Sequence, residues 1–218
     1  MVSFRHNLHR GQWVCQAIEY WFTDLLSFKG MSHSTQKGGF LSVASTQGIA
    51  LVFPDTSPRG AGIEGEAAEW DFGVAAGFYL DATNPKYAKH YNMRTLVTTE
   101  FPRVLEAAGL PLVRSLGLFL LILLKAPSLR KDFKRQSIFG HSMGGHGALT
   151  LYLSSKTKQY RSASAFAPIA NPTKCPIGKK AFTGYLQGGV EEAKDQYDAT
   201  DLIAKFKEPV HILVDYVY

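Results

Sequence analysis

Short apolar runs alternate with segments of helical spacing over most of the chain. Four runs predict buried strands because each is only a few residues long and is followed by turn residues or a polar segment. Apolar side chains at helical spacing predict a helix over residues 92–108 and another over 148–153. Strands that alternate with helices favour a mainly parallel sheet with helices on both faces. The predicted strands are 49–53, 136–139, 162–166 and 210–214.

The length of 218 residues predicts one domain over residues 1–218, and a hydrophobic content of 45% is enough to build a core. A nine-residue apolar run at 116–124 is the exception to this globular pattern. It is too short for a membrane span, which needs about 20 apolar residues. The run is expected to be a buried strand or helix, or an apolar surface patch.

The formal charge of +6 arises from basic residues that are spread along the chain. No aromatic residues are interleaved with them, so a solvated basic surface is expected, with no nucleic-acid partner. A small anionic substrate is compatible with this charge. Two cysteines are too few for a disulfide framework, and residues 1–30 show no secretory signal, so a cytoplasmic location is predicted.

Residues 140–144, Gly-His-Ser-Met-Gly, follow one predicted strand and precede a predicted helix. This is the context of a nucleophile elbow, a tight turn that lifts a serine hydroxyl above the sheet edge. Ser142 is the candidate nucleophile. The backbone N–H of Met143, at the positive end of the following helix, is the candidate oxyanion donor.

A serine nucleophile needs a general base, and the histidines near or after Ser142 are poor candidates. His146 lies four residues further along and is expected to support the helix. His211 lies inside an apolar predicted strand and is expected to be structural, while His141 is expected to pack or hydrogen-bond locally. A nucleophile is therefore predicted without a convincing base.

Several motifs follow one another in a fixed order along the chain. One is the elbow in its wider context, Ser-Ile-Phe-Gly-His-Ser-Met-Gly-Gly-His-Gly-Ala. Others are Phe-Pro-Asp-Thr-Ser-Pro-Arg-Gly and Trp-Asp-Phe-Gly followed by Ala-Gly-Phe-Tyr-Leu-Asp-Ala-Thr. The motifs lie at 53–60, 70–73, 76–83, 137–148, 164–172 and 175–182. Together they resemble the S-formylglutathione hydrolase (esterase D) family, and the similarity extends over residues 37–112 and 132–215.

This resemblance implies an α/β-hydrolase fold and a serine thioesterase that uses no cofactor and no metal. Such an enzyme hydrolyses S-formylglutathione to glutathione and formate in formaldehyde detoxification, in the cytosol and often as a homodimer. A general small-ester carboxylesterase is the nearest alternative. Carried onto this chain, the resemblance makes Ser142 the acyl acceptor and Met143 one oxyanion donor.

The chain also departs from the family pattern in three places. Residues 1–36 are divergent where the family carries its second oxyanion donor, and residues 113–131 form an apolar insertion. The aspartate and histidine of the family's triad have no counterpart before Tyr218. We therefore expect a domain that is incomplete at both ends, from a truncated or mis-spliced product, with impaired activity. The alternative from a different functional class is a protein without catalytic activity, either an inactive fragment or a pseudoenzyme.

Further residues are weaker candidates, each with a simpler structural interpretation. An aromatic cluster could line the pocket, although core packing is favoured, and three basic side chains could hold glutathione carboxylates, although plain surface charge is favoured. Cys175 is expected to be an ordinary cysteine. The cluster is Trp70, Asp71 and Phe72, and the basic residues are Arg59, Lys179 and Lys180.

Overall fold

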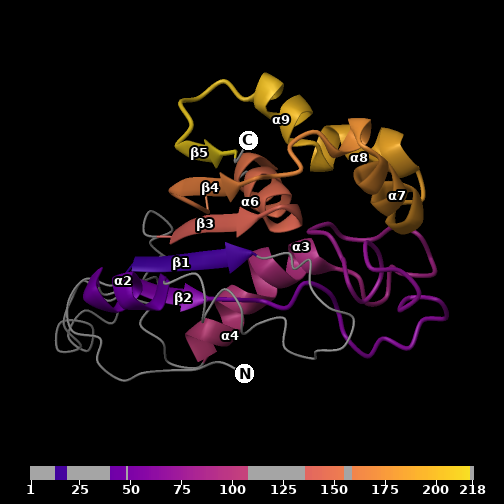
Figure 1. The fold of residues 1–218 in the computed structure, drawn as a ribbon, viewed down its shortest axis with the longest axis horizontal. Helices are drawn as coiled ribbons and strands as arrows, with labels where there is room; N and C mark the ends of the chain where they lie inside the picture. The colour runs from indigo at the N-terminus through magenta and orange to yellow at the C-terminus, as the bar shows by residue number, and fades with distance from the viewer. Residues whose placement is uncertain (1–12, 19–39, 48, 108–135, 155–158, 217–218) are drawn as a thin grey trace, which may run out of the picture.

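A five-stranded sheet lies at the centre of the computed structural model, which describes residues 13–18, 40–47, 49–107, 136–154 and 159–216 (Figure 1). The strand order is β2-β1-β3-β4-β5, and every pairing is parallel. The expected parallel α/β architecture is thus confirmed. The strands are β1 (Trp13–Ile18), β2 (Ile49–Val52), β3 (Gln136–His141), β4 (Ser162–Phe166) and β5 (Ile212–Asp215).

Four of these strands coincide with the predicted apolar runs, but β1 was not predicted. It lies within the divergent segment 1–36 and pairs with β2 on one side and β3 on the other. The chain therefore moves outward from β1 to β2 and returns across β1 to β3. In parallel sheets, ligands bind beyond the carboxyl ends of strands at such a reversal. The end of β3 lies at this position.

Helix α6 (Met143–Ser154) packs on β1, β3 and β4, and α2 (Phe40–Gln47) packs on β2. The predicted helix over 92–108 is present as α3 (Met93–Thr95), the π-helix η1 (Leu96–Glu100) and α4 (Phe101–Ala107). The later helices are η3 (Pro172–Lys174), α7 (Pro176–Tyr185), α8 (Gly189–Tyr197) and α9 (Ala199–Lys205).

The connection from β2 to α3 lies beyond the carboxyl ends of the strands, beside α7 and α8 (Figure 1). It has little regular structure and is held by buried aromatic rings. Tyr185 of α7 stacks on Phe72 with ring centroids 4.3 Å apart, and its hydroxyl donates to the carbonyl of Ala76 at 2.7 Å. That hydroxyl also accepts the N–H of Gly73 at 2.7 Å. Tyr185 thus fixes this long loop to α7.

Two segments singled out in the sequence fall largely outside the described residues. The apolar insertion at 113–131, with its run at 116–124, lies entirely outside them, as does segment 1–36 apart from β1. None of the helices in the described part of the chain is long and apolar enough to cross a membrane.

Candidate active site

Ser142 occupies the turn between β3 and α6 in a backbone conformation that non-glycine residues rarely adopt. Its φ is +53°, in the left-handed region. Three hydrogen bonds hold it there. Its N–H donates to the carbonyl of Phe166 at 2.9 Å, and its carbonyl accepts from His146 N at 3.0 Å and Ile169 N at 3.2 Å. A strained residue held this firmly by its surroundings is typical of functional sites.

Glycines that follow the elbow allow α6 to lie close to its neighbours. A Cβ atom at Gly145 would lie 2.9 Å from Cβ of Pro168, and one at Gly147 would lie 2.4 Å from Cδ2 of Tyr79. Tyr79 is fully buried, so its ring cannot swing into solvent. Both glycines lie just after the Gly-His-Ser-Met-Gly motif. The structure therefore assigns a steric role to Gly145 and Gly147.

Gly147→Ala is expected to lower the free energy of unfolding by about 1–2 kcal/mol, because overpacking a core costs about 1–3 kcal/mol. Helix propensity alone predicts the opposite sign, a gain of about 1 kcal/mol. Urea denaturation measures the difference. Ser45→Ala on the exposed part of α2 is the control, since it gains helix propensity without meeting a neighbour. A Gly147→Ala protein more stable than wild type would contradict this prediction, because it would show that the Tyr79 ring moves to accommodate the added methyl group.

Met143 is the first residue of α6, and its side chain is fully buried. The first N–H groups of a helix have no acceptor within the helix, and they carry its positive end. These groups lie directly beside Ser142. The arrangement suits stabilisation of negative charge that develops next to the serine hydroxyl.

His146 is completely buried, and its ring joins α6 to the end of α8. Nε2 lies 2.7 Å from the carbonyl oxygen of Tyr197. A carbonyl only accepts, so Nε2 carries the hydrogen. The ring packs edge-on against Phe78 with centroids 5.5 Å apart. Burial lowers the pKa of His146 to about 4, opposed by its bond to Tyr197 and by the charge of Asp198. The structural role expected of His146 is confirmed.

The other two histidines differ from expectation. His141 was expected to pack or to hydrogen-bond locally; its side chain is exposed at the end of β3, so the packing alternative is wrong. His211 is also exposed and directly precedes β5, which places it at the amino end of that strand, away from the elbow. No hydrogen bond within the described residues joins the Ser142 hydroxyl to a histidine.

The weaker candidates divide between core and surface. Phe72 packs against Tyr185 and Tyr87 as a core residue, whereas Trp70 is 53% exposed, so core packing is wrong for Trp70. Asp71 accepts a 2.5 Å bond from Lys180, which also pairs with Glu69. The two carboxylates raise the pKa of Lys180. Lys180 therefore ties α7 to the loop that carries Trp70.

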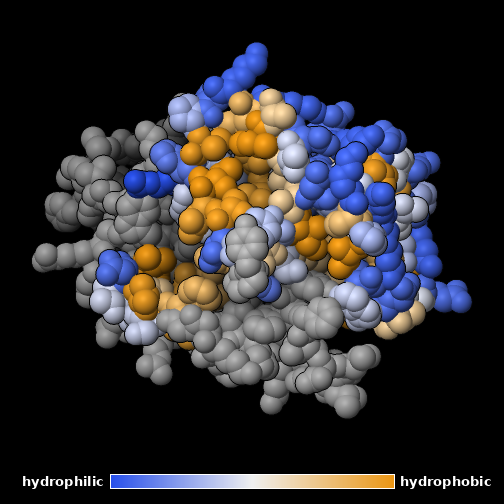
Figure 2. All heavy atoms as spheres, turned by 45° about the horizontal axis from the view of Figure 1, so that its top comes forward, coloured by the Kyte–Doolittle hydropathy of each residue, from blue (hydrophilic) through white to orange (hydrophobic). Residues whose placement is uncertain are grey.

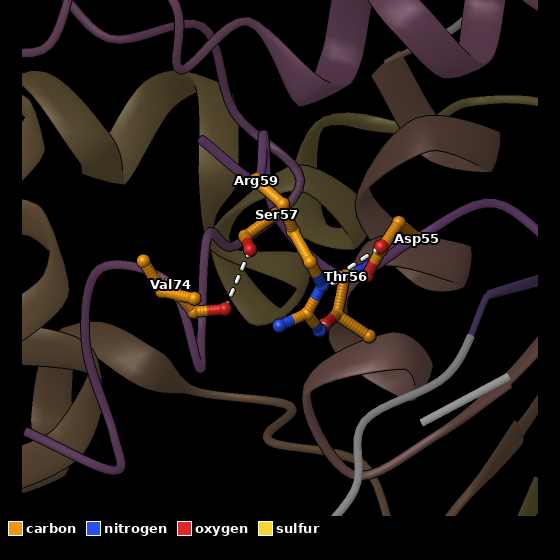
Figure 3. Close-up of polar contacts among 5 residues, drawn as sticks. All are labelled: Asp55, Thr56, Ser57, Arg59 and Val74. Carbon is orange, nitrogen blue, oxygen red and sulfur yellow. Dashed lines mark hydrogen bonds and ion pairs between the residues drawn. The ribbon is translucent and has the colours of Figure 1, made fainter. Parts of the chain in front are cut away.

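The remaining basic candidates lie on the surface. Arg59 pairs with Asp55 through Nε at 2.8 Å, beside a turn in which the hydroxyl of Ser57 donates to the carbonyl of Val74 at 2.6 Å (Figure 3). Lys179 is exposed. Cys175 is half-buried at the start of α7, and its thiol lies 3.6 Å from the carbonyl of Pro172. In the described part, no group of three or more His, Cys, Asp or Glu residues could hold a metal ion.

Asp198 is a structural residue of the site that the sequence analysis did not identify. It is fully buried and caps α9 by accepting Thr200 N at 3.0 Å. Its second carboxylate oxygen accepts both the N–H and the hydroxyl of Thr173, at 3.0 and 2.7 Å. The available signal was an aspartate directly before a short helical segment. The 197–198 segment thus binds both α6, through His146, and η3.

Comparison with known proteins agrees with this geometry. The family model described as a putative esterase matches residues 20–214. A protein of Arabidopsis thaliana called S-formylglutathione hydrolase is 48% identical over 180 residues, which are 82% of this chain. A mouse (Mus musculus) protein of the same name is 42% identical over 203 residues, which are 92% of this chain.

The solved structure of an S-formylglutathione hydrolase from Agrobacterium tumefaciens superposes with a TM-score of 0.74 at 33% identity, over 95% of this chain. The chain covers 56% of the Arabidopsis protein, 63% of the mouse protein and 65% of the Agrobacterium chain. This chain therefore spans less than two thirds of the length of these relatives.

Proposed function

The chain belongs to the putative esterase family, and on that premise we propose that it is a serine thioesterase that hydrolyses S-formylglutathione. The observation that carries the proposal is Ser142, held in the left-handed conformation between β3 and the start of α6. The name shared by the relatives supplies the substrate. The reaction consumes one water and yields glutathione and formate.

In the proposed reaction, the Ser142 hydroxyl attacks the thioester carbonyl and loses its proton to solvent water. The carbonyl oxygen becomes an oxyanion beside the N–H of Met143 and the positive end of α6. The tetrahedral intermediate collapses by breaking the carbon–sulfur bond, which releases glutathione as a thiolate and leaves a formyl ester on Ser142. Water then attacks this ester and releases formate. A thiolate is a good leaving group because a thiol has a pKa of about 8.5.

Exposed groups beyond the carboxyl ends of the strands are proposed to bind the glutathione moiety. Lys179 is exposed, as is Trp70, and both suit a ligand with two carboxylates and an extended backbone. Arg59 is the weaker candidate because its Nε is already paired with Asp55. A chain with two cysteines and this substrate fits a cytosolic location.

We further propose that turnover by this chain is slow. In the described residues, His146 is buried with its N–H bound to Tyr197, and the Ser142 hydroxyl bonds to no histidine. Loss of the base from a serine hydrolase triad lowers the rate by on the order of 10⁴–10⁶-fold, while oxyanion donors and binding leave residual catalysis.

Purified protein assayed with S-formylglutathione and with a chromogenic acetate ester tests the substrate. We expect a higher kcat/KM for S-formylglutathione, because a thiolate leaves readily and Lys179 is available to its carboxylates. Lys179→Gln is expected to raise KM for the glutathione thioester and to leave the acetate ester unchanged. Equal rates on both substrates would favour the carboxylesterase alternative. No turnover by a cooperatively folded sample would favour a catalytically inactive protein.

A further inference from the structure

Left-handed backbone conformations gather around the elbow. Among the described residues, only three that are not glycine have a positive φ, namely Phe78 at +50°, Ser142 at +53° and Ala167 at +42°. Phe78 packs against the ring of His146 in the first turn of α6. Ala167 directly follows the residue whose carbonyl accepts the Ser142 N–H. Strain of this kind persists only where the surroundings hold it, and it concentrates at functional sites.

The segment 166–169, at the end of β4, binds both backbone polar groups of Ser142. Phe166 is the last residue of β4 and lies opposite His141 at the end of β3. Its carbonyl accepts the Ser142 N–H at 2.9 Å, and the N–H of Ile169 donates to the Ser142 carbonyl at 3.2 Å. These two bonds hold the peptide groups on either side of Ser142, so they fix its backbone conformation.

The Ser142 carbonyl and the Met143 N–H belong to one peptide group. This group is planar, and in the trans form its carbonyl and its N–H point in opposite directions. The N–H groups of His146 and Ile169 hold the carbonyl, at 3.0 and 3.2 Å. The Met143 N–H must therefore point away from both donors. The segment 166–169 thus helps to orient the backbone donor that the proposed reaction uses.

Ala167 makes the turn within this segment. Its N–H donates to the carbonyl of Asp215 at 2.7 Å, which ties the turn to the end of β5. Pro168, the next residue, is buried, and its Cβ would lie 2.9 Å from a Cβ atom added at Gly145. A residue before proline favours extended backbone with a negative φ, so a φ of +42° is unfavourable here. Contacts on both sides therefore impose the turn on Ala167.

We propose that Ala167 is a positioning residue for catalysis. Its left-handed backbone brings the Phe166 carbonyl and the Ile169 N–H onto the two peptide groups of Ser142. This inference rests on the proposed role of Ser142 as nucleophile. A residue at position 167 that avoids a positive φ moves the Ile169 N–H away from the Ser142 carbonyl. The peptide that carries the Met143 N–H is then held less firmly, and the oxyanion loses stabilisation.

Two substitutions of similar size, Ala167→Val and Ala167→Asn, test this role by amide hydrogen exchange, which needs no active enzyme. Asparagine adopts the left-handed conformation readily, whereas a β-branched residue almost never does. Valine is expected to speed exchange at the Ser142 and Ile169 amides by more than about tenfold, and asparagine by less than about twofold. Helix α8, on the largely hydrophilic side of the molecule that also carries α7 (Figure 2), is the internal reference. Its exchange is expected to be unchanged.

Acylation of Ser142 by the chromogenic acetate ester, followed by mass spectrometry, is the second measurement. Ala167→Val is expected to lower the maximal acylation rate by more than about tenfold, because a misdirected donor acts on the transition state. The ester concentration that gives half of this rate should stay the same, since ester binding is not affected. Ala167→Asn should retain the wild-type rate, which a role in packing alone does not explain, because both side chains add similar volume.

Equal exchange rates in the valine and asparagine variants, or an equal fall in their acylation, would overturn the proposal. Thermal melts verify that each variant is folded. Ala167→Leu, which matches asparagine in shape, provides the same comparison if the valine variant does not fold. A wild-type protein whose elbow amides are protected but which is not acylated would refute the proposed role of Ser142. The exchange comparison would then decide the role of Ala167 by itself.

Discussion

Ser142→Ala is expected to reduce hydrolysis of both the thioester and the chromogenic acetate ester to the rate in buffer. The alanine retains the elbow but has no hydroxyl to accept the acyl group, and in intact serine hydrolases loss of the nucleophile costs on the order of 10⁶-fold in kcat. Because the wild-type chain is expected to be slow, an excess of enzyme and a long time course are needed. Mass spectrometry of the quenched reaction should find the acyl group on wild-type protein only.

Ser154→Ala is the control for this substitution. Ser154 is the last residue of α6, partly buried and at the opposite end of the helix from the elbow. Its replacement should change neither the rate nor the acylation. Turnover that persists in the Ser142→Ala protein would exclude Ser142 as the nucleophile and refute the serine-hydrolase mechanism.

The second large effect concerns stability as the pH falls. The pKa of His146 is lowered from 6.5 to about 4 in the folded protein, chiefly by burial. The His146 side chain therefore takes up a proton near pH 6.5 in the unfolded chain, whereas in the folded protein it takes up the proton only near pH 4. The contribution of His146 is fully present above pH 6.5 and declines through this window, by about 3 kcal/mol in total.

Urea denaturation of wild type and His146→Gln measures this effect. The glutamine amide retains a donor for the carbonyl of Tyr197 but does not titrate. Between about pH 7 and about pH 5, wild type should lose about 2 kcal/mol more than the variant. Thr150→Val on the same helix removes a hydroxyl bonded to the carbonyl of His146 at 3.0 Å, and should retain the wild-type pH slope. Parallel slopes for wild type and His146→Gln would show that His146 titrates normally.

Local patterns were sufficient to predict most of the sheet. The apolar runs at 49–53, 136–139 and 162–166 became β2, β3 and β4 within a few residues, because a short apolar run bounded by turns has few other ways to be buried. Strand β1 was missed. It has no long apolar run, and it is a strand because two parallel neighbours provide its hydrogen-bond partners.

The elbow was predictable for the same reason. The turn that holds Ser142 between a strand and a helix depends on residues close to it in the chain, so the motif predicts it. The left-handed φ of Ser142 was seen only in the structure. The contacts of the histidines were harder to predict from the sequence. His146 was correctly assigned to the helix, but its partner is the carbonyl of Tyr197, 51 residues away. The exposure of His141 depends on the packing around the end of β3, which the pattern does not contain.

The sequence by itself determined the parallel α/β architecture, the nucleophile elbow and the family, because these depend on local periodicity and on motifs in a fixed order. Only the tertiary structure decided that Trp70 lies on the surface while Phe72 packs in the core. It also showed that a side chain at position 147 would clash with the Tyr79 ring. It further decided that Lys180 pairs with Asp71 across 109 residues. These features depend on groups that are far apart in the chain, and folding alone brings them within contact distance.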